Sequence, residues 1–496
     1  MNANLFATLR QAYEHRLDST FLQVPGRSAL TYRDLDERSA ALAGALRDLG
    51  VTVGDRVAVQ IDKSPDAVAL YLGCLRLGAV FLPLNTAYTT AEVQYFVDDA
   101  APAVVVGRPG TLADLAVPVV HLGTDRDGDL AASADTAEPF DAVAERGPDD
   151  LAAMLYTSGT TGRSKGAMLT HANLESNARA LHDIWRFRPD DVLLHTLPIF
   201  HVHGLFVALH CAMLGANEVV FLPRFDLDEV LDHLSSATVM MGVPTHYTRL
   251  LDDDRFDPSR CATIRLFTSG SAPMTAAVHE EFTRRSGKQI LERYGMTEAG
   301  MITSNPYDGD RVPGTVGFAL PGVDLRVADD DGATVPTGAT GVVEIRSPGL
   351  FAGYWQLPDT TSDAFRSDGW FITGDVGSLD ADGRLTLEGR SSDMIISGGY
   401  NIYPKEIEMV LDAVPGILET AVIGVPHHDF GEAVVAVVVR DGTVTVTDDQ
   451  LAQHLEGVLA RFKHPKSYIA ADALPRNAMS KVQKAGLRTD HATLFA

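Results

Sequence analysis

The segment Tyr156–Gly166 reads YTSGTTGRSKG and directly follows an apolar run that ends at Leu155. Glycines and small hydroxyl residues let backbone N–H groups approach an anion closely, and Lys165 adds a positive charge. The segment therefore predicts a phosphate-binding loop after a buried strand. It is not a Walker A loop, because no Gly-Lys-Ser/Thr follows a glycine at the required spacing. Taken alone, it leaves open a flexible Ser/Gly loop without a ligand.

A second motif overlaps this loop: Gly162–Gly166 fits G-x-S-x-G, the nucleophile elbow of α/β hydrolases. That elbow places its serine on a sharp turn immediately after a buried strand. Here Thr157–Thr161 separate the strand from the motif, and a lysine beside the serine has no role in an elbow. We therefore favour the phosphate loop over a serine hydrolase.

Composition limits the class of protein and its partners. The chain has 496 residues, and 41 Lys+Arg against 66 Asp+Glu give a formal net charge of −25. This length predicts one large core and at least one smaller domain. An acidic chain without a dense Lys/Arg stripe repels nucleic acid and anionic membranes, so neither is an expected partner. No apolar run is long enough to span a bilayer.

Cysteine usage and the N-terminus indicate the compartment. Only Cys74, Cys211 and Cys261 occur, far apart, which favours a reducing environment and argues against a structural zinc site. The first residues carry charge too early for a signal peptide. We expect a cytoplasmic protein with no obligatory protein partner.

Hydrophobic periodicity predicts an α/β fold. Short apolar runs alternate with helix-period segments up to about Val323, as in mostly parallel sheets with crossover helices. Thr31 and Asp34 are typical of a helix N-cap, and Gly50 ends that helix. Beyond Val323 the strands are shorter and punctuated by Gly and Asp, which predicts an antiparallel subdomain. The acidic stretch 124–150 has few large apolar residues, so we expect a surface excursion.

The pattern changes to α+β after Arg390. We expect a large N-terminal domain over residues 1–390, with two mostly parallel α/β subdomains and the antiparallel β subdomain. A hinge at 391–393 and a small, mobile α+β domain over 394–496 complete the prediction.

Eight segments in a fixed order resemble the motifs of the acyl-adenylate-forming superfamily, which comprises acyl-CoA synthetases, carrier-protein adenylation domains and luciferases. After the phosphate loop come PIFHVHGL from Pro198, TSGSAP from Thr268, LERYGMTE from Leu291, GVVEIRSPGLFAGYW from Gly341, FITGDVG from Phe371, LEGRSSDMIISGGYNIYPKEIE from Leu387 and LPRNAMSKVQK from Leu474. The resemblance covers essentially the whole chain. It implies two steps: a carboxylate attacks the α-phosphate of ATP to give acyl-AMP, and a thiol then attacks the acyl carbon.

The resemblance also implies an ATP site with Mg²⁺. In-line attack concentrates negative charge at the α-phosphate, so cations must be aimed there. Lys481 matches the lysine that bridges the substrate carboxylate and the α-phosphate, and Thr157 and Glu298 match the Mg²⁺ contacts. Asp375 would accept both ribose hydroxyls. The implied ATP-binding residues are Thr157, Ser158, Gly159, Thr160, Thr161, Gly162, Lys165, Gly270, Ser271, Ala272, Glu292, Arg293, Tyr294, Gly295, Met296, Thr297, Asp375, Arg390 and Lys481.

The resemblance favours CoA over a carrier protein as acyl acceptor. No carrier module follows Ala496, and in relatives the segment that matches Ser397–Glu408 lines the pantetheine tunnel. The implied CoA residues are Gly398, Gly399 and Tyr400. Two positions depart from the pattern: Ser392 stands at a hinge position that is commonly Asp or Lys, and Ser480 replaces a glycine before the lysine. These departures keep a non-catalytic nucleotide-binding homologue open.

Three segments, Phe200–Val207, Met241–Leu251 and Arg293–Gly317, look most like malonyl-CoA synthetases. A dicarboxylate leaves a second charge in a mostly apolar pocket, which requires a buried cation. We expect Arg249 to be that cation, although an arginine on a helix is more often solvated. The other expected acyl-pocket residues are His201, which we also count as catalytic, His203, Val202, Ser269 and Met301.

The acid itself stays open. Many malonate-selective relatives have threonine where Val202 stands, so methylmalonate or another 2-substituted malonate is a further candidate. The alternatives to a malonate–CoA ligase are a CoA ligase for another short acid and an enzyme that loads a carrier protein.

Overall fold

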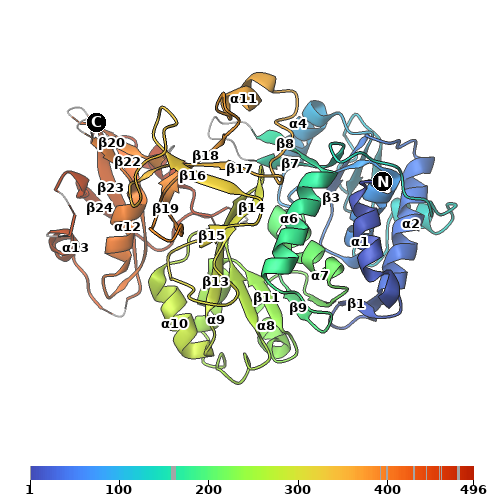
Figure 1. Cartoon of the computed structure of the whole chain (residues 1–496), viewed down its shortest axis with the longest axis horizontal. Coiled ribbons are helices and arrows are strands. Elements are labelled where there is room, and N and C mark those ends of the chain that lie inside the picture. The colour runs from blue at the N-terminus through green and yellow to red at the C-terminus, as the bar shows by residue number, and fades with distance from the viewer. Residues whose placement is uncertain are drawn as a thin grey trace.

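A computed structural model describes residues 2–157, 164–390, 393–397, 400–427, 430–442, 444–456, 458–459, 461–477 and 481–495. These residues form four sheets, covered by helices (Figure 1). The helices are α1 (Leu5–Tyr13), α2 (Tyr32–Asp48), α3 (Pro65–Leu77), α4 (Thr90–Ala100), α5 (Asp129–Ala134), α6 (His171–Ile184), α7 (His210–Leu214), α8 (Leu227–Leu234), α9 (Pro244–Leu251), α10 (Ala276–Ser286), α11 (Pro358–Asp363), α12 (Pro404–Asp412), α13 (Asp448–Leu455) and α14 (Lys484–Asp490).

Two large sheets make up most of the N-terminal part. The six-stranded sheet runs β6 (Val119–His121), β5 (Val104–Gly107), β3 (Arg56–Gln60), β4 (Val80–Pro83), β7 (Leu151–Thr157) and β8 (Lys165–Thr170). The nine-stranded sheet runs β15 (Phe318–Ala319), β14 (Gly300–Ser304), β13 (Ile290–Met296), β12 (Leu266–Ser269), β11 (Val239–Gly242), β9 (Val192–His195), β10 (Glu218–Phe221), β1 (Thr20–Gln23) and β2 (Leu30–Thr31). Their central strands are parallel, which confirms the predicted α/β architecture.

Two further sheets follow along the chain. The antiparallel sheet runs β16 (Asp324–Ala328), β17 (Gly341–Arg346), β18 (Phe371–Leu379) and β19 (Leu385–Arg390), so the predicted antiparallel subdomain is confirmed. The last sheet runs β21 (Tyr400–Ile402), β20 (Ile395–Ser397), β23 (Gly431–Arg440) and β22 (Ile417–His427), with β24 (Ser467–Ala471) beside β23. It has two apolar clusters of its own and forms the orange and red part of Figure 1. The hinge at 391–393 stays a prediction, because residues 391 and 392 lie outside the described residues.

Two local predictions have different outcomes. The helix α2 begins with a capping box between Thr31 and Asp34, as predicted. The stretch 124–150 is not merely a surface excursion, since it contains α5, whose Leu130 is fully buried against the main core. Small residues permit this close packing: a Cβ atom at Gly44 of α2 would lie 2.3 Å from the carbonyl oxygen of Glu138.

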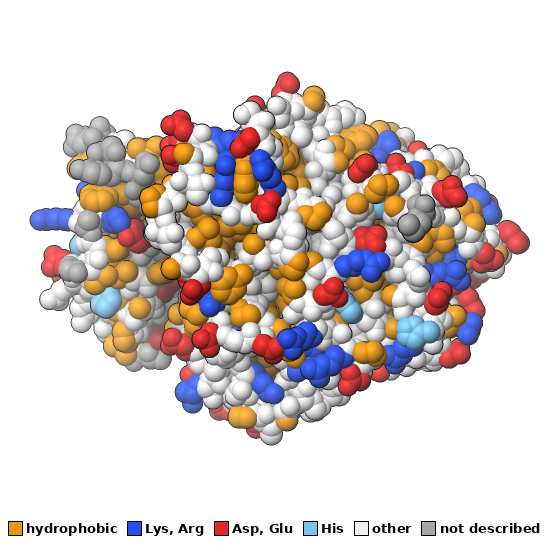
Figure 2. Space-filling model, viewed as in Figure 1, with side chains coloured by type: hydrophobic (Ala, Val, Ile, Leu, Met, Phe, Trp, Pro, Cys, Tyr) orange, Lys and Arg blue, Asp and Glu red, His pale blue; other side chains and the backbone are white. Residues whose placement is uncertain are grey.

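Helix length and the distribution of surface charge bear on membrane and polyanion partners. No helix of the described part of the chain combines the length and apolar character that crossing a bilayer requires. On the face shown in Figure 2, Lys and Arg side chains are interspersed with Asp and Glu rather than gathered into a stripe.

Candidate active site

Asp375, which is buried, and Arg390, which is half-buried, form an ion pair on the antiparallel sheet. They are direct cross-strand partners on β18 and β19, so the strand register itself brings them together. Arg390 Nε lies 2.9 Å from Asp375 Oδ1, while the hydroxyl of Tyr294 donates to Oδ2. Asp375 is nearly inaccessible to solvent, and burial together with this carboxylate raises the pKa of Tyr294 well above its ordinary value. Tyr294, an expected ATP-binding residue, thus also holds the carboxylate that is expected to bind the ribose.

Glu298 lies just beyond β13 and is buried. The hydroxyl of Tyr354 donates to Glu298 Oε1 at 3.0 Å, and burial and Glu298 together raise the pKa of that tyrosine. The ammonium of Lys165, at the start of β8, lies 5.1 Å from the centroid of the Tyr354 ring. Tyr354 was not predicted as a site residue, although the motif GVVEIRSPGLFAGYW contains it.

Lys481 of the C-terminal sheet region lies within electrostatic reach of both groups. Its backbone is held by two hydrogen bonds with Asn477, each 3.0 Å long. Burial and the charge of Arg390 lower the pKa of Lys481, while Asp375 and Glu298 act in the opposite direction. The fold therefore brings together three predicted site residues that lie 77 to 183 positions apart in the sequence.

Several predicted site residues lie outside the described part of the chain or are described only in their backbone. The structure gives no placement for Ser158, Gly159, Thr160, Thr161, Gly162, Ser392, Gly398, Gly399 and Ser480. The backbone of Tyr400 belongs to β21. Thr157 is described at the end of β7, opposite Lys165 on β8, at the point where the phosphate loop begins. The roles of these residues stay predictions.

The expected ATP-binding residues Gly270, Ser271 and Ala272 follow β12. Ser271 has a positive φ of 70°, and its Oγ lies 3.3 Å from His203 Nδ1. The side chain of Glu292 is engaged by the protein, since its Oε1 lies 2.9 Å from His279 Nδ1 and accepts from the Gly314 N–H at 3.2 Å. This buried His279–Glu292 pair was not predicted, and it fixes β13 against α10.

Arg293 is a buried guanidinium with unused hydrogen-bond donors. The residue is only 3% exposed, and its Nε and Nη2 have no hydrogen-bond partner among the described residues. Burial lowers the pKa of Arg293 to about 10. A Cβ atom at Gly270 would lie 2.5 Å from Arg293 Nη1, so only glycine leaves room for the guanidinium there.

Further buried polar atoms on β12 and at His203 are also without hydrogen-bond partners. Thr268 Oγ1, Ser269 Oγ and His203 Nε2 have no hydrogen-bond partner within the described ranges. Burial, and secondly the charge of Arg293, lowers the pKa of His201 to about 4 and that of His203 well below its ordinary value. Both imidazoles are therefore neutral at pH 7. Buried polar groups normally find partners, so this cluster has the character of a ligand site that needs an anion with several acceptor atoms.

Arg249, the expected buried cation, is exposed. Its guanidinium lies 5.8 Å from the centroid of the Phe225 ring. The reason lies in α9: Tyr247 and Leu250 are fully buried and take the core-facing side of the helix, which leaves Arg249 on the outer side. The expectation of burial at this position is wrong, and the buried guanidinium is that of Arg293.

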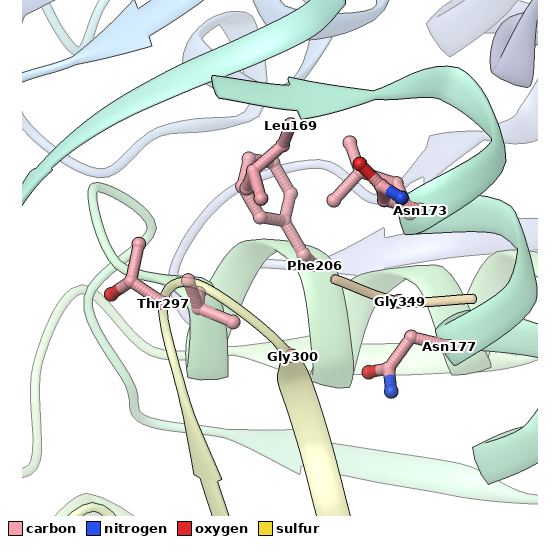
Figure 3. Close-up of a pocket in the computed structure, with 9 residues that line it drawn as sticks. Leu169, Asn173, Asn177, Phe206, Thr297, Gly300 and Gly349 are labelled. Carbon is pink, nitrogen blue, oxygen red and sulfur yellow. The ribbon is translucent and has the colours of Figure 1, made fainter. Parts of the chain in front are cut away.

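A small cavity lies beside the expected acyl pocket. Its volume is about 10 Å³, which is room for about one water-sized group. Figure 3 shows Phe206 and Leu169 close together at one side and Asn173 and Asn177 of α6 at another. Val202 and Thr297 also line it. Val202 and Met301, the expected pocket walls, are both buried.

Comparison with known proteins identifies both parts of the chain. Residues 9–355 match the family model described as AMP-binding enzyme, and residues 406–481 match the AMP-binding enzyme C-terminal domain. The crystal structure of ATP-bound MatB from Rhodopseudomonas palustris superimposes with a TM-score of 0.97 at 50% identity and covers 100% of both chains.

Two curated relatives carry different substrates in their names. The mitochondrial malonate–CoA ligase ACSF3 of Mus musculus is 37% identical over 92% of this chain and 85% of its own length. The indoleacetate–CoA ligase of Aromatoleum aromaticum is 36% identical over 94% and 95%. A further malonate–CoA ligase, from Arabidopsis thaliana, is 34% identical over 88% of this chain and 78% of its own length, so malonate recurs among the acids that the relatives' names give.

Proposed function

We propose that this chain, which belongs to the AMP-binding enzyme family, is an ATP-dependent malonate–CoA ligase. In the first step a malonate carboxylate oxygen attacks the α-phosphorus of ATP, and the bond from that phosphorus to the bridging oxygen of pyrophosphate breaks. In the second step the thiolate of CoA attacks the acyl carbon of malonyl-AMP and AMP leaves. The products are malonyl-CoA, AMP and pyrophosphate.

The observation that supports malonate as the substrate acid is the unpaired guanidinium of Arg293. An uncompensated buried charge costs about 3–5 kcal/mol, and a ligand carboxylate that accepts from Nε and Nη2 would recover much of this in a bidentate pair. His203, which lies within electrostatic reach of Arg293, offers a further unused polar atom at Nε2. A monocarboxylic acid with an apolar tail would leave all of these atoms unpaired, whereas malonate brings a second carboxylate.

The adenylation step needs positive charge at the α-phosphate. Lys481 is the candidate, since it already lies within electrostatic reach of Glu298, Asp375 and Arg390. Asp375 would hold the ribose, after exchange of the hydrogen bond that it now accepts from Tyr294. Lys165 would attract the outer phosphates from the start of β8. His201 would remain neutral and donate or accept hydrogen bonds at the reactive carboxylate.

Mg²⁺ accompanies ATP in this proposal. The described residues contain no cluster of three or more His, Cys, Asp or Glu side chains that would bind a metal alone. A single buried carboxylate beside a hydroxyl residue suits Mg²⁺, which takes its remaining ligands from substrate phosphates and water. Glu298 and Thr157 would hold the ion, and the ion would neutralise phosphate charge. Tyr354 would orient the Glu298 carboxylate through its hydrogen bond.

In the thioester step the C-terminal domain would also bind CoA. Gly398, Gly399 and Tyr400 are proposed to line the pantetheine tunnel, and Ser392 to act as the hinge. We propose CoA as the acceptor because the named relatives are CoA ligases. The domain boundaries at 390 and 394 are part of the same proposal.

Methylmalonate is the second candidate acid. The cavity that Val202 lines has a volume of about 10 Å³, which gives room for one small group such as a methyl substituent. A larger 2-substituent would require Phe206 or Leu169 to move.

The test is pyrophosphate release with ATP, Mg²⁺ and CoA over a panel of acids: malonate, methylmalonate, succinate, acetate and indoleacetate. We expect malonate to have the highest kcat/KM, with methylmalonate next. Acetate should react up to about 10⁴-fold less well, because it leaves Arg293 unpaired. Equal kcat/KM values for acetate and malonate would overturn the assignment of the acid, and CoA-independent ester cleavage would point to a hydrolase.

A further inference from the structure

Lys63 and His195 form a hydrogen-bonded pair at the C-terminal edge of the nine-stranded sheet. Lys63 lies immediately before the N-cap of α3, and His195 is the last residue of β9. The ammonium nitrogen Nζ lies 2.7 Å from His195 Nδ1 and donates to the His195 carbonyl oxygen at 3.0 Å. It also lies 4.3 Å from the centroid of the Phe221 ring. None of these groups has a role in the two reaction steps above.

The other ring nitrogen of His195 reaches the acyl-pocket loop. His195 Nε2 lies 2.9 Å from the carbonyl oxygen of Gly204. Because a carbonyl oxygen can only accept, Nε2 must carry the hydrogen. Burial and the charge of Lys63 hold the pKa of His195 well below its ordinary value, so Nδ1 is the unprotonated acceptor of the Lys63 hydrogen bond. Donation therefore runs from Lys63 through His195 to the Gly204 carbonyl.

Gly204 is the second residue of the π-helical segment η2 (His203–Leu209). This segment starts at His203, one of the unpaired groups of the acyl pocket, and directly follows Val202. The backbone around Gly204 is tightly packed, since a Cβ atom there would lie 2.1 Å from the Pro198 carbonyl oxygen. A π-helical turn is rare and frequently marks a functional site, so a hydrogen bond to its first turn has a direct effect on where His203 stands.

We propose that Lys63 and His195 are positioning residues for the acid substrate. Through the Gly204 carbonyl they hold the first turn of η2, and thereby set His203 and Val202 against the carboxylate that Arg293 binds. The inference rests on the proposed function for the identity of the acid, but not for the arrangement of the hydrogen bonds. The ATP groups Asp375, Arg390 and Lys481 lie on other elements, so we expect the pair to affect binding of the acid more than binding of the nucleotide.

Two substitutions of His195 separate the two ring nitrogens. In His195→Gln the amide nitrogen can occupy the place of Nε2 and still donate to Gly204, whereas in His195→Asn the amide reaches only the place of Nδ1 and the Gly204 carbonyl loses its donor. Lys63→Met removes the hydrogen-bond donor that His195 Nδ1 accepts from. The matched controls are His233→Asn on α8 and Lys288→Met before β13, both outside the site.

Initial rates of pyrophosphate release give the KM values for malonate and for ATP, and thermal unfolding gives the Tm of each variant. We expect His195→Asn and Lys63→Met to raise the malonate KM by about 10-fold, the scale of one lost buried hydrogen bond, with the ATP KM within about 2-fold. His195→Gln should stay within about 3-fold of the wild type in both. The controls should match the wild type.

Three outcomes would overturn the inference: an unchanged malonate KM in His195→Asn, a parallel rise of both KM values, or equal defects in His195→Gln and His195→Asn. If one of the variants Lys63→Met and His195→Asn does not fold, the other still tests the inference. Each interrupts the same series of hydrogen bonds from Lys63 through His195 to Gly204. A wild type that prefers another acid would refute the proposed function alone, and the same KM ratios would then be measured with that acid.

Discussion

Replacing Arg293 with Met would remove the only guanidinium that the described structure buries next to His203. The loss of one partner of a buried, hydrogen-bonded charge pair costs about 2–5 kcal/mol, so we expect kcat/KM for malonate to fall by roughly 10²-fold or more. Activity with acetate should change little or rise. The ratio of kcat/KM for malonate to that for acetate, measured by pyrophosphate release, is the decisive quantity.

Arg249→Met is the matched comparison, because the same substitution is made at an exposed position of α9. A guanidinium that already has solvent and the Phe225 ring as neighbours has little to gain from the ligand, so we expect a loss of a few-fold at most. A larger loss in Arg249→Met than in Arg293→Met would assign the distal carboxylate to Arg249 and require α9 to rearrange when the acid binds.

The single hydroxyl of Tyr354 orients the carboxylate of Glu298. In Tyr354→Phe the carboxylate loses the 3.0 Å hydrogen bond at Oε1 and becomes free to rotate. We expect the Mg²⁺ concentration for half-maximal pyrophosphate release to rise by about 10-fold, with the malonate KM unchanged. Tyr468→Phe is the control, since the Tyr468 hydroxyl is buried without a partner among the described residues. An unchanged Mg²⁺ requirement would show that Tyr354 does not contribute to Mg²⁺ binding through Glu298.

At the scale of elements, the contact between α2 and the segment after α5 can be tested with glycine substitutions. A Cβ atom at Gly44 would lie 2.3 Å from the Glu138 carbonyl oxygen, so Gly44→Ala should destabilise the protein by about 1–3 kcal/mol through overpacking. A Cβ atom at Gly486 of α14 would meet no described atom within 4 Å, and Gly486→Ala should stabilise that helix by about 0.5–1 kcal/mol. Urea unfolding measures both, and equal signs would contradict the packing argument.

The elements also show what a sequence can predict and why. The strands of the two large sheets were recognisable because short apolar runs alternate with helix-period segments up to about Val323. The segment α5 was missed, since short side chains can be buried without a strong hydrophobic pattern. The exposure of Arg249 was missed because the orientation of α9 depends on where Tyr247 and Leu250 find space, which is a property of the packed core and not of the local sequence.

At the scale of the whole molecule, the sequence predicted the residues that we propose to bind ATP but not the residue that we propose to bind the acid. Glu298, Asp375 and Lys481 were found as members of an ordered motif series, and the fold brings them together. Arg293 belongs to the same series of motifs, in LERYGMTE, but that motif predicted only a role in ATP binding. Its role depends on a missing partner, and only a three-dimensional arrangement reveals that a buried donor has none among the described residues.

The C-terminal domain must serve both half-reactions, and Lys481 allows the two to be separated. In the present arrangement this lysine lies within electrostatic reach of Asp375 and Glu298, which suits the adenylation step, whereas the proposed CoA residues Gly398 and Gly399 lie on another segment of the same domain. Lys481→Ala should therefore abolish malonate-dependent pyrophosphate release. It should leave the conversion of supplied malonyl-AMP and CoA to malonyl-CoA largely intact.

The two rates are measured separately on the same preparation, one by pyrophosphate and the other by thioester formation. Lys466→Ala, directly before β24, is the control for a charge lost elsewhere on this domain. Loss of both half-reactions in Lys481→Ala would mean that the lysine also holds the domain in the pose for thioester formation. Retention of both would mean that the charge at the α-phosphate comes from the N-terminal domain, with Arg390 as the nearest candidate beside Asp375.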